Sequence, residues 1–191
     1  MRRSRTIMLS VILLAAQACA DRPDTTGPGA RTPAAASLAA AKVKQQPIQM
    51  FDRCDALTFN TLGAGTCIRP ERGVALPDFI AEIQRTGAAQ AWRFEPGEVT
   101  IPLGTTLLAV NRGGEVHTFT EVAHFGGGRL QLLNDLSGNP IPAPECLALP
   151  GSADVRPGGS FPDTPDEVGT ELYQCCIHPW MRTTVHIRPR S

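Results

Sequence analysis

Short runs of apolar and β-branched residues follow one another along the C-terminal half of the chain. Proline and glycine separate the runs, and each run is only a few residues long. Such runs are typical of strands, because β-branched side chains pack well on a pleated surface and proline and glycine favour turns. We therefore predict an all-β core, a sandwich of two sheets, with strands at 98–101, 105–110, 116–122 and 183–187.

Two other segments depart from this pattern. Between Val74 and Arg85 the apolar residues have a helical spacing, and Gly87 is placed to end a helix. From 125 to 162, glycine, proline, asparagine and leucine dominate without a clear period. We predict one short helix in the first segment and a long, extended loop insertion in the second.

The N-terminal residues have the composition of a targeting signal. Several arginines precede an apolar run from Ile7 to Ala16, which is too short to span a bilayer of roughly 30 Å. We interpret residues 1–19 as a secretory signal. Small residues at 16 and 18 suit ordinary cleavage, whereas Cys19 resembles the acylated cysteine of a bacterial lipoprotein and would tether the chain to a membrane.

Residues 20–47 are rich in alanine, proline, threonine and glycine and have almost no bulky apolar side chains. Such a segment cannot bury enough surface to fold, so we predict a disordered linker. The remaining length suits one ordinary domain. We expect an N-terminal extension with the short helix at 48–90 and the β domain at 91–191.

The charge of the chain excludes some classes of partner. The 18 basic residues cancel the 18 acidic ones, and the isoelectric point is about 6.9. No overall field would draw the protein onto nucleic acid or an anionic membrane. We therefore expect no nucleic-acid partner, and we expect docking to a protein partner to depend only modestly on salt.

The segment from Tyr173 to Met181 holds the most informative motif, because Cys175, His178 and Met181 have the spacing C-x2-H-x2-M. A thiolate, an imidazole and a thioether select copper over hard cations, and two histidines, one cysteine and a long axial methionine form the blue-copper arrangement. The second histidine must come from another strand, since one compact loop cannot surround the ion. His117 is the candidate for that position.

The chain has two other histidines and six cysteines. We interpret His124 and His186 as structural or surface residues. In an exported chain, cysteines first suggest disulfides, because the compartment is oxidising. With Cys19 in the signal and one of the adjacent pair at 175 and 176 bound to metal, four remain, and four allow three connectivities. We favour the pairs Cys54 with Cys67 and Cys146 with Cys176.

The motifs above resemble the cupredoxin family of type 1 blue copper proteins, and in particular amicyanin and plastocyanin. The similarity covers residues 91–189, and the segment from Cys175 to Met181 matches the short amicyanin-type ligand loop. It implies a Greek-key β-sandwich with one type 1 copper ion held by His117, Cys175, His178 and Met181. The two-residue gap before His178 identifies Cys175, rather than Cys176, as the thiolate ligand. The segments that resemble the family's strands are 92–96, 99–111, 156–161 and 169–173.

The resemblance implies one-electron transfer between redox partner proteins and no bound substrate. Electrons would pass through a partly exposed edge of His178, with Pro179 and Trp180 lining an apolar docking surface. An enzyme such as a copper oxidase or nitrite reductase needs further histidine-rich copper sites, and this chain has only four histidines and no His-x-His pair. The alternative function is a periplasmic copper carrier or buffer, which would use the same ligands but exchange the metal readily. Both functions place the chain in a bacterial periplasm or on a membrane as a lipoprotein.

Overall fold

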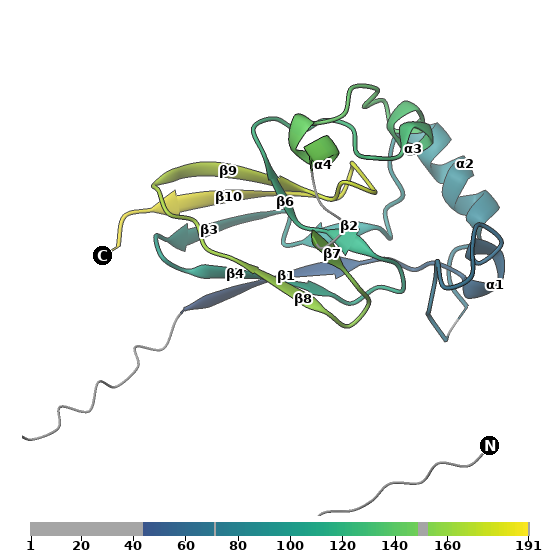
Figure 1. Cartoon of the computed structure of the whole chain (residues 1–191), viewed down its shortest axis with the longest axis horizontal. Helices are drawn as coiled ribbons and strands as arrows, with labels where there is room; N and C mark the ends of the chain where they lie inside the picture. The colour runs from purple at the N-terminus through teal and green to yellow at the C-terminus, as the bar shows by residue number, and fades with distance from the viewer. Residues whose placement is uncertain (1–43, 71, 149–152, 191) are drawn as a thin grey trace, which may run out of the picture. The chain divides into compact units, whose positions relative to one another are not determined.

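The computed structural model describes residues 44–70, 72–148 and 153–190, so the predicted signal at 1–19, Cys19 and most of the predicted linker lie outside the described residues. The strands are β1 (Gln45–Phe51), β2 (Arg93–Glu95), β3 (Glu98–Pro102), β4 (Thr106–Asn111), β5 (His117–Thr118), β6 (Thr120–Val122), β7 (Asp154–Val155), β8 (Ser160–Asp163), β9 (Gly169–Gln174) and β10 (Arg182–Arg188). One sheet has the strand order β2-β1-β4-β8 and the other β3-β10-β9-β6, and β5 pairs with β7. The two larger sheets enclose the apolar core, which confirms the predicted all-β sandwich (Figure 1).

The first strand begins earlier than the sequence suggested. β1 lies between β2 and β4, antiparallel to the first and parallel to the second. It begins at Gln45, inside the segment that we expected to be linker, and Ile48 and Met50 are fully buried in the core. The extension predicted at 48–90 therefore contributes a strand to the sandwich predicted at 91–191. Only two side chains of β1 alternate into the core. This apolar pattern is too short to be recognised as a strand within a proline-rich segment.

The other predicted strands are present with small shifts. β3, β4 and β10 cover the expected ranges to within one residue at each end. The predicted strand at 116–122 is divided at Phe119, because β5 pairs with β7 whereas β6 pairs with β9 of the second large sheet. Phe119 itself is buried and stacks on Tyr173 with a ring-centroid distance of 4.4 Å.

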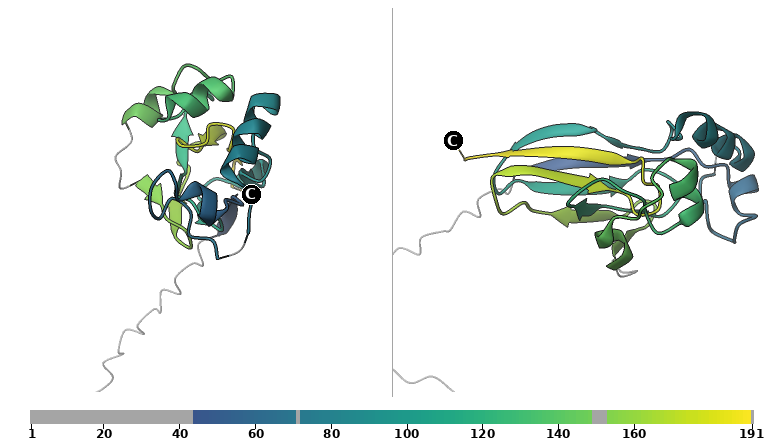
Figure 2. Two further views of the ribbon diagram at one scale, coloured as in Figure 1. Left: turned by 90° about the vertical axis from the view of Figure 1, so that its right-hand side faces the viewer. Right: turned by 90° about the horizontal axis from the view of Figure 1, so that it is seen from above.

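The helices lie mostly outside the two sheets. They are α1 (Ala56–Phe59), α2 (Leu76–Thr86), α3 (Gln131–Leu136) and α4 (Pro144–Ala148). α2 confirms the predicted helix, and Gly87 ends it in the left-handed conformation with φ of 76°. α1, α2 and α3 lie at the end of the sandwich where the β9–β10 loop is also found (Figures 1 and 2). No helix in the described ranges has the length and apolar character that a membrane crossing requires.

The segment from 125 to 162 is not the extended insertion that we expected. It contains α3 and α4, and its end forms β7 and most of β8, which pairs with β4. Neither helix is long enough to produce two turns of apolar periodicity, so the sequence pattern could not reveal them. Tertiary contacts hold them instead, since the Asn134 side chain accepts a hydrogen bond from the Gly128 amide at 2.6 Å and donates to its carbonyl at 3.0 Å.

Both favoured disulfides are present. Cys54 is bonded to Cys67 and Cys146 to Cys176, with separations of 13 and 30 positions. Each bridge stabilises the fold by roughly 3 kcal/mol in the chain-entropy model. The first joins the segment between β1 and α1 to the loop after α1, and the second joins α4 to the β9–β10 loop. Cys175 is the free cysteine of the described residues, and it is fully buried.

Candidate metal centre

Three of the four predicted ligands converge at the helical end of the sandwich. His117 lies on β5, Cys175 directly follows β9, and His178 lies in the β9–β10 loop. Their ligand atoms all lie within 4.8 Å of one another, and the Cys175 Sγ is 3.9 Å from Nδ1 of each imidazole. All three side chains are buried. One soft sulfur and two imidazole nitrogens therefore face a common point, which fits a metal site.

The environment of Cys175 favours its thiolate form. Burial alone would raise the pKa of this thiol, but its contacts with His117 and His178 hold the pKa well below the ordinary value. The backbone amides of Thr118 and Ile177 also donate to Sγ, at 3.4 and 3.5 Å. A thiolate is the form of cysteine that binds metals, so the site is prepared for a cation.

Met181 lies next to the cluster through a tight turn. Its backbone N–H donates to the His178 carbonyl at 2.9 Å, and its carbonyl accepts from the Cys175 N–H at 3.0 Å. Its side chain is fully buried within the core. These two hydrogen bonds close the backbone turn that carries Cys175, His178 and Met181.

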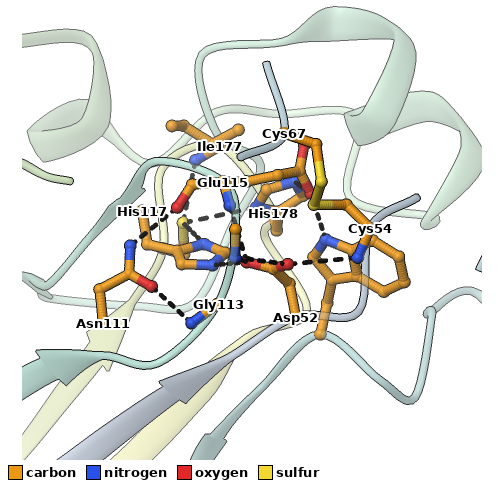
Figure 3. Close-up of polar contacts among 12 residues, drawn as sticks. Asp52, Cys54, Cys67, Asn111, Gly113, Glu115, His117, Ile177 and His178 are labelled. Atoms are coloured by element: carbon orange, nitrogen blue, oxygen red, sulfur yellow. Dashed lines mark hydrogen bonds and ion pairs between the residues drawn. A yellow bond between two sulfur atoms is a disulfide. The ribbon is translucent and has the colours of Figure 1, made fainter. Parts of the chain in front are cut away.

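A buried carboxylate holds the outer nitrogen of His117. Asp52, which directly follows β1, lies with Oδ2 at 2.9 Å from His117 Nε2 (Figure 3). The same carboxylate accepts hydrogen bonds from the amides of Cys54, Gly114 and Glu115. Since a carboxylate surrounded by donors can only accept, His117 donates from Nε2 to Asp52, and Nδ1 is the ring nitrogen that faces Cys175.

The pKa values of this pair move in opposite directions. Burial alone would raise the pKa of Asp52, but the hydrogen bond to His117 and those from the backbone hold it well below its usual range. Burial alone would lower the pKa of His117, but its hydrogen bonds to Asp52 and Cys175 raise the pKa to about 9. The pair is therefore stabilised in its charged form.

A second carboxylate lies near the outer nitrogen of His178. Glu115 Oε2 is 3.7 Å from His178 Nε2 and accepts a hydrogen bond from Trp92 Nε1 at 2.5 Å. Burial raises the pKa of Glu115, although its interactions with His178 and Trp92 act in the opposite direction. Trp92 is itself fixed between Phe59 and Phe79, with ring-centroid distances of 5.7 and 4.5 Å. Phe59 of α1 and Phe79 of α2 thus hold Trp92, and Trp92 in turn binds the Glu115 carboxylate.

Two glycines allow the backbone to approach Asp52. A Cβ atom at Gly113 would lie 1.8 Å from Asp52 Oδ2, and one at Gly114 would lie 2.8 Å from Cys54 Sγ. Asn111 closes the turn, since its amide group donates to the Glu115 carbonyl at 2.7 Å and its Oδ1 accepts from the Gly113 amide at 2.8 Å. The Gly-Gly pair is therefore what lets the Asp52 carboxylate bind the turn that leads to His117.

Sequence reasoning missed both carboxylates. Asp52 is 65 positions from His117, so no local spacing relates the two residues. The only signal for Asp52 was its place directly after a short alternating strand, and the only signal for Glu115 was its proximity to His117.

The interpretations of the other histidines agree with the structure. His124 is exposed, and His186 pairs with Glu98 on the surface at 2.9 Å.

The predicted exposed edge of His178 is wrong. Only 2% of His178 is exposed, and Pro179 is also buried. Phe79 of α2 and the partly buried Trp180 flank the imidazole, with ring-centroid distances of 6.3 and 5.6 Å. The resemblance that predicted an open edge did not extend to residues 48–90, and this segment supplies the helix that covers the imidazole.

Comparison with solved structures finds proteins of the cupredoxin type. A purple cupredoxin from Nitrosopumilus maritimus is similar over 52% of this chain and 86% of its own, with 22% identity and a TM-score of 0.39. Amicyanin from Paracoccus versutus is similar over 53% of this chain and 77% of its own, with 21% identity and a TM-score of 0.34. No family model matches the chain, and a search of curated proteins finds no match.

Proposed function

We propose that this chain binds one copper ion through His117, Cys175, His178 and Met181 and transfers single electrons. The observation that supports this most directly is the position of the Cys175 Sγ at 3.9 Å from Nδ1 of both histidines. A thiolate with two imidazoles and a nearby thioether is the donor set of a type 1 copper site. When bound, copper would supply one-electron cycling between Cu²⁺ and Cu⁺.

The residues around the site would keep its geometry constant during electron transfer. Asp52 holds the ring of His117, and backbone hydrogen bonds hold the turn that carries the other three proposed ligands. A site that is held in this way needs little rearrangement when the charge of the ion changes. Burial of the ligands also excludes water, which is consistent with electron transfer rather than with chemistry on a substrate.

The test is to add Cu²⁺ to the purified protein and record its visible spectrum. We expect an intense blue or purple colour from cysteine-to-copper charge transfer, and Cys175→Ala should abolish it. The matched control is the double variant Cys146→Ala with Cys176→Ala, which removes the neighbouring cysteine and its disulfide partner together. That variant should keep the colour, and a colour that instead disappears with Cys176 would refute the assignment of the thiolate.

The alternative function, a copper carrier or buffer, predicts fast exchange of the metal. The burial of His117, Cys175 and His178 favours slow exchange, because a competing chelator cannot reach the ion directly. We expect loss of copper to a chelator to be slow in both oxidation states. Rapid transfer in either state would favour the carrier.

We also propose that the chain is exported to the bacterial periplasm and that its partners are redox proteins. The two disulfides support export, since such bonds persist in oxidising compartments. Anchoring through an acylated Cys19 remains a prediction, which mass spectrometry of the mature N-terminus would test. Because His178 is covered, the docking surface proposed near His178, Pro179 and Trp180 requires the electron to pass through the half-buried Trp180 ring.

A further inference from the structure

A large apolar cavity lies directly above the buried imidazole of His178. It has a volume of about 720 Å³ and lies among residues of α1, α2, α3 and the β9–β10 loop. These elements come together at one end of the sandwich (Figure 1). Ligand pockets in proteins have volumes of about 300 to 1,000 Å³, so the cavity could hold one small organic molecule. Its apolar lining is formed by Phe59, Leu62, Leu76, Phe79, Leu132 and Ile177.

Two ionisable side chains are among the residues that line the cavity. Glu115 and His178 both line it, and they keep side-chain exposures of 10% and 3%. Glu115 is the only acidic side chain of the lining, and no lysine or arginine is among the lining residues. An anion would therefore meet a carboxylate with no cation to offset it. A bulky cation would lose its hydration against the apolar walls, whereas a neutral molecule would lose far less.

We propose that this cavity binds one small, neutral aromatic molecule that donates a hydrogen bond to the Glu115 carboxylate, as a phenol does. The faces and edges of Phe59 and Phe79 would contact the aromatic ring. The carboxylate accepts hydrogen bonds and thereby selects a hydroxyl or N–H group over a purely apolar ligand. This inference goes beyond the proposed electron transfer, and it requires only the folded chain, with or without copper.

The test is a calorimetric titration of the protein with 1-naphthol, in the presence and absence of copper. We expect one saturable site with a dissociation constant of about 10 to 1,000 µM, in line with the affinity available to a ligand of this size. Binding of 1-naphthoate should be about tenfold weaker or more, because its carboxylate would face Glu115. Glu115→Gln should reduce this difference, since it removes the repulsive charge.

Two leucines of equal exposure provide the matched variants. Leu132 lines the cavity and is 65% exposed, whereas Leu147 on α4 is 66% exposed and does not line it. Leu132→Asp should weaken 1-naphthol binding about tenfold or more, because it places a charge at the apolar wall, and Leu147→Asp should change it by less than about twofold.

Four results would overturn the proposal. The first is that no saturable binding is seen up to about 1 mM 1-naphthol, and the second is that both leucine variants weaken 1-naphthol binding equally. The third is that a naphthyl ammonium cation binds more tightly than 1-naphthol. The fourth is that a protein partner occupies the cavity. In the last case, small probes would fail to bind while Leu132→Asp alone weakened association with the partner. Because the titration is also performed without copper, a negative result there would leave the proposed metal site untouched.

Discussion

The two imidazoles of the candidate site are held in different ways. His117 is 2.9 Å from Asp52, a fully buried carboxylate that also binds three backbone amides. His178 lies 3.7 Å from Glu115, and its position depends on packing against Phe79 and Trp180. The first imidazole is therefore held by a short hydrogen bond to a carboxylate, and the second by aromatic contacts and a longer contact with a carboxylate.

This difference suggests a division of roles between the two sides of the site. A carboxylate that binds a ligating histidine fixes its tautomer and increases its basicity, which strengthens metal binding. The Asp52 side would thus determine how tightly the metal is held. The His178 side borders the large cavity and is the side at which a partner or small molecule could influence the site. Substitutions on the two sides should separate these roles.

The largest effect is expected for Asp52→Asn. Loss of the charge behind His117 should weaken copper binding by about 10- to 100-fold, as is typical when the partner of a ligating histidine is removed. It should also lower the free energy of unfolding of the copper-free protein by about 2 kcal/mol, because buried amides lose their charged acceptor. Competition with a copper chelator and urea unfolding measure the two quantities.

The exposed pair of Glu98 and His186 is the matched control for Asp52→Asn. It has the same oxygen–nitrogen distance of 2.9 Å, but Glu98 is 73% exposed. Glu98→Gln should cost less than about 1 kcal/mol and leave copper affinity unchanged. If both substitutions weakened copper binding equally, Asp52 would have no special role at the site.

The second prediction concerns acid unfolding of the copper-free protein. The pKa of Asp52 is lowered on folding, so its contribution to stability is present above the ordinary value of 3.8 and is lost as pH falls below it. His117 has a raised pKa of about 9, so its contribution is complete below 6.5 and is constant in this acid range. The melting temperatures of the wild type and Asp52→Asn should therefore approach each other by about 3 °C between about pH 5 and pH 3. A constant difference across this range would mean that Asp52 is not ionised at a lowered pKa.

The sequence predicted the sandwich, α2, both disulfides and the three side chains that converge, which are His117, Cys175 and His178. Each of these depends on a local pattern or a family motif, such as the alternation in β10, the glycine after α2 and the spacing of Cys175 and His178. His117 could be predicted because it lies in another predicted strand, at the first-ligand position of the family that the sequence resembles.

The sequence could not predict what covers and supports the site. Asp52 and His117 are brought together by the pairing of β1 with β4, a parallel contact between segments that no turn connects. α3 and α4 are too short for periodicity and are held by Asn134 and Cys146. The burial of His178 likewise follows from how α2 packs on the end of the sandwich, which is a property of tertiary structure alone.

The third prediction concerns Glu115→Gln, for which we expect a smaller effect than for Asp52→Asn. The longer distance between the Glu115 carboxylate and His178 weakens its influence on the metal. Copper affinity should fall by only about threefold, less than when a carboxylate in direct hydrogen-bond contact with a ligating histidine is removed. The reduction potential should rise, since removal of a negative charge favours Cu⁺ over Cu²⁺. If Glu115→Gln lowered copper affinity as much as Asp52→Asn does, the proposed difference between the His117 side and the His178 side of the site would be wrong.

The smallest expected effect is that of salt on electron exchange between oxidised and reduced copies of the protein. The net charge is zero, and the cavity beside His178 is lined by a single acidic side chain and no lysine or arginine. Association at that end should therefore change by less than about threefold between low and physiological ionic strength. Line broadening in nuclear magnetic resonance spectra measures this rate without a partner protein.

A different result is expected if the copies meet elsewhere. Burial and the nearby charges of Asp163, Asp166 and Glu167 raise the pKa values of both Glu121 and Glu171, so these acidic side chains lie close together. Two copies that met through this acidic cluster would repel each other, and salt would screen the repulsion and raise the rate steeply. A steep increase would therefore show that electrons leave through the sheet edge rather than the helical end, whereas a flat response favours the His178 side.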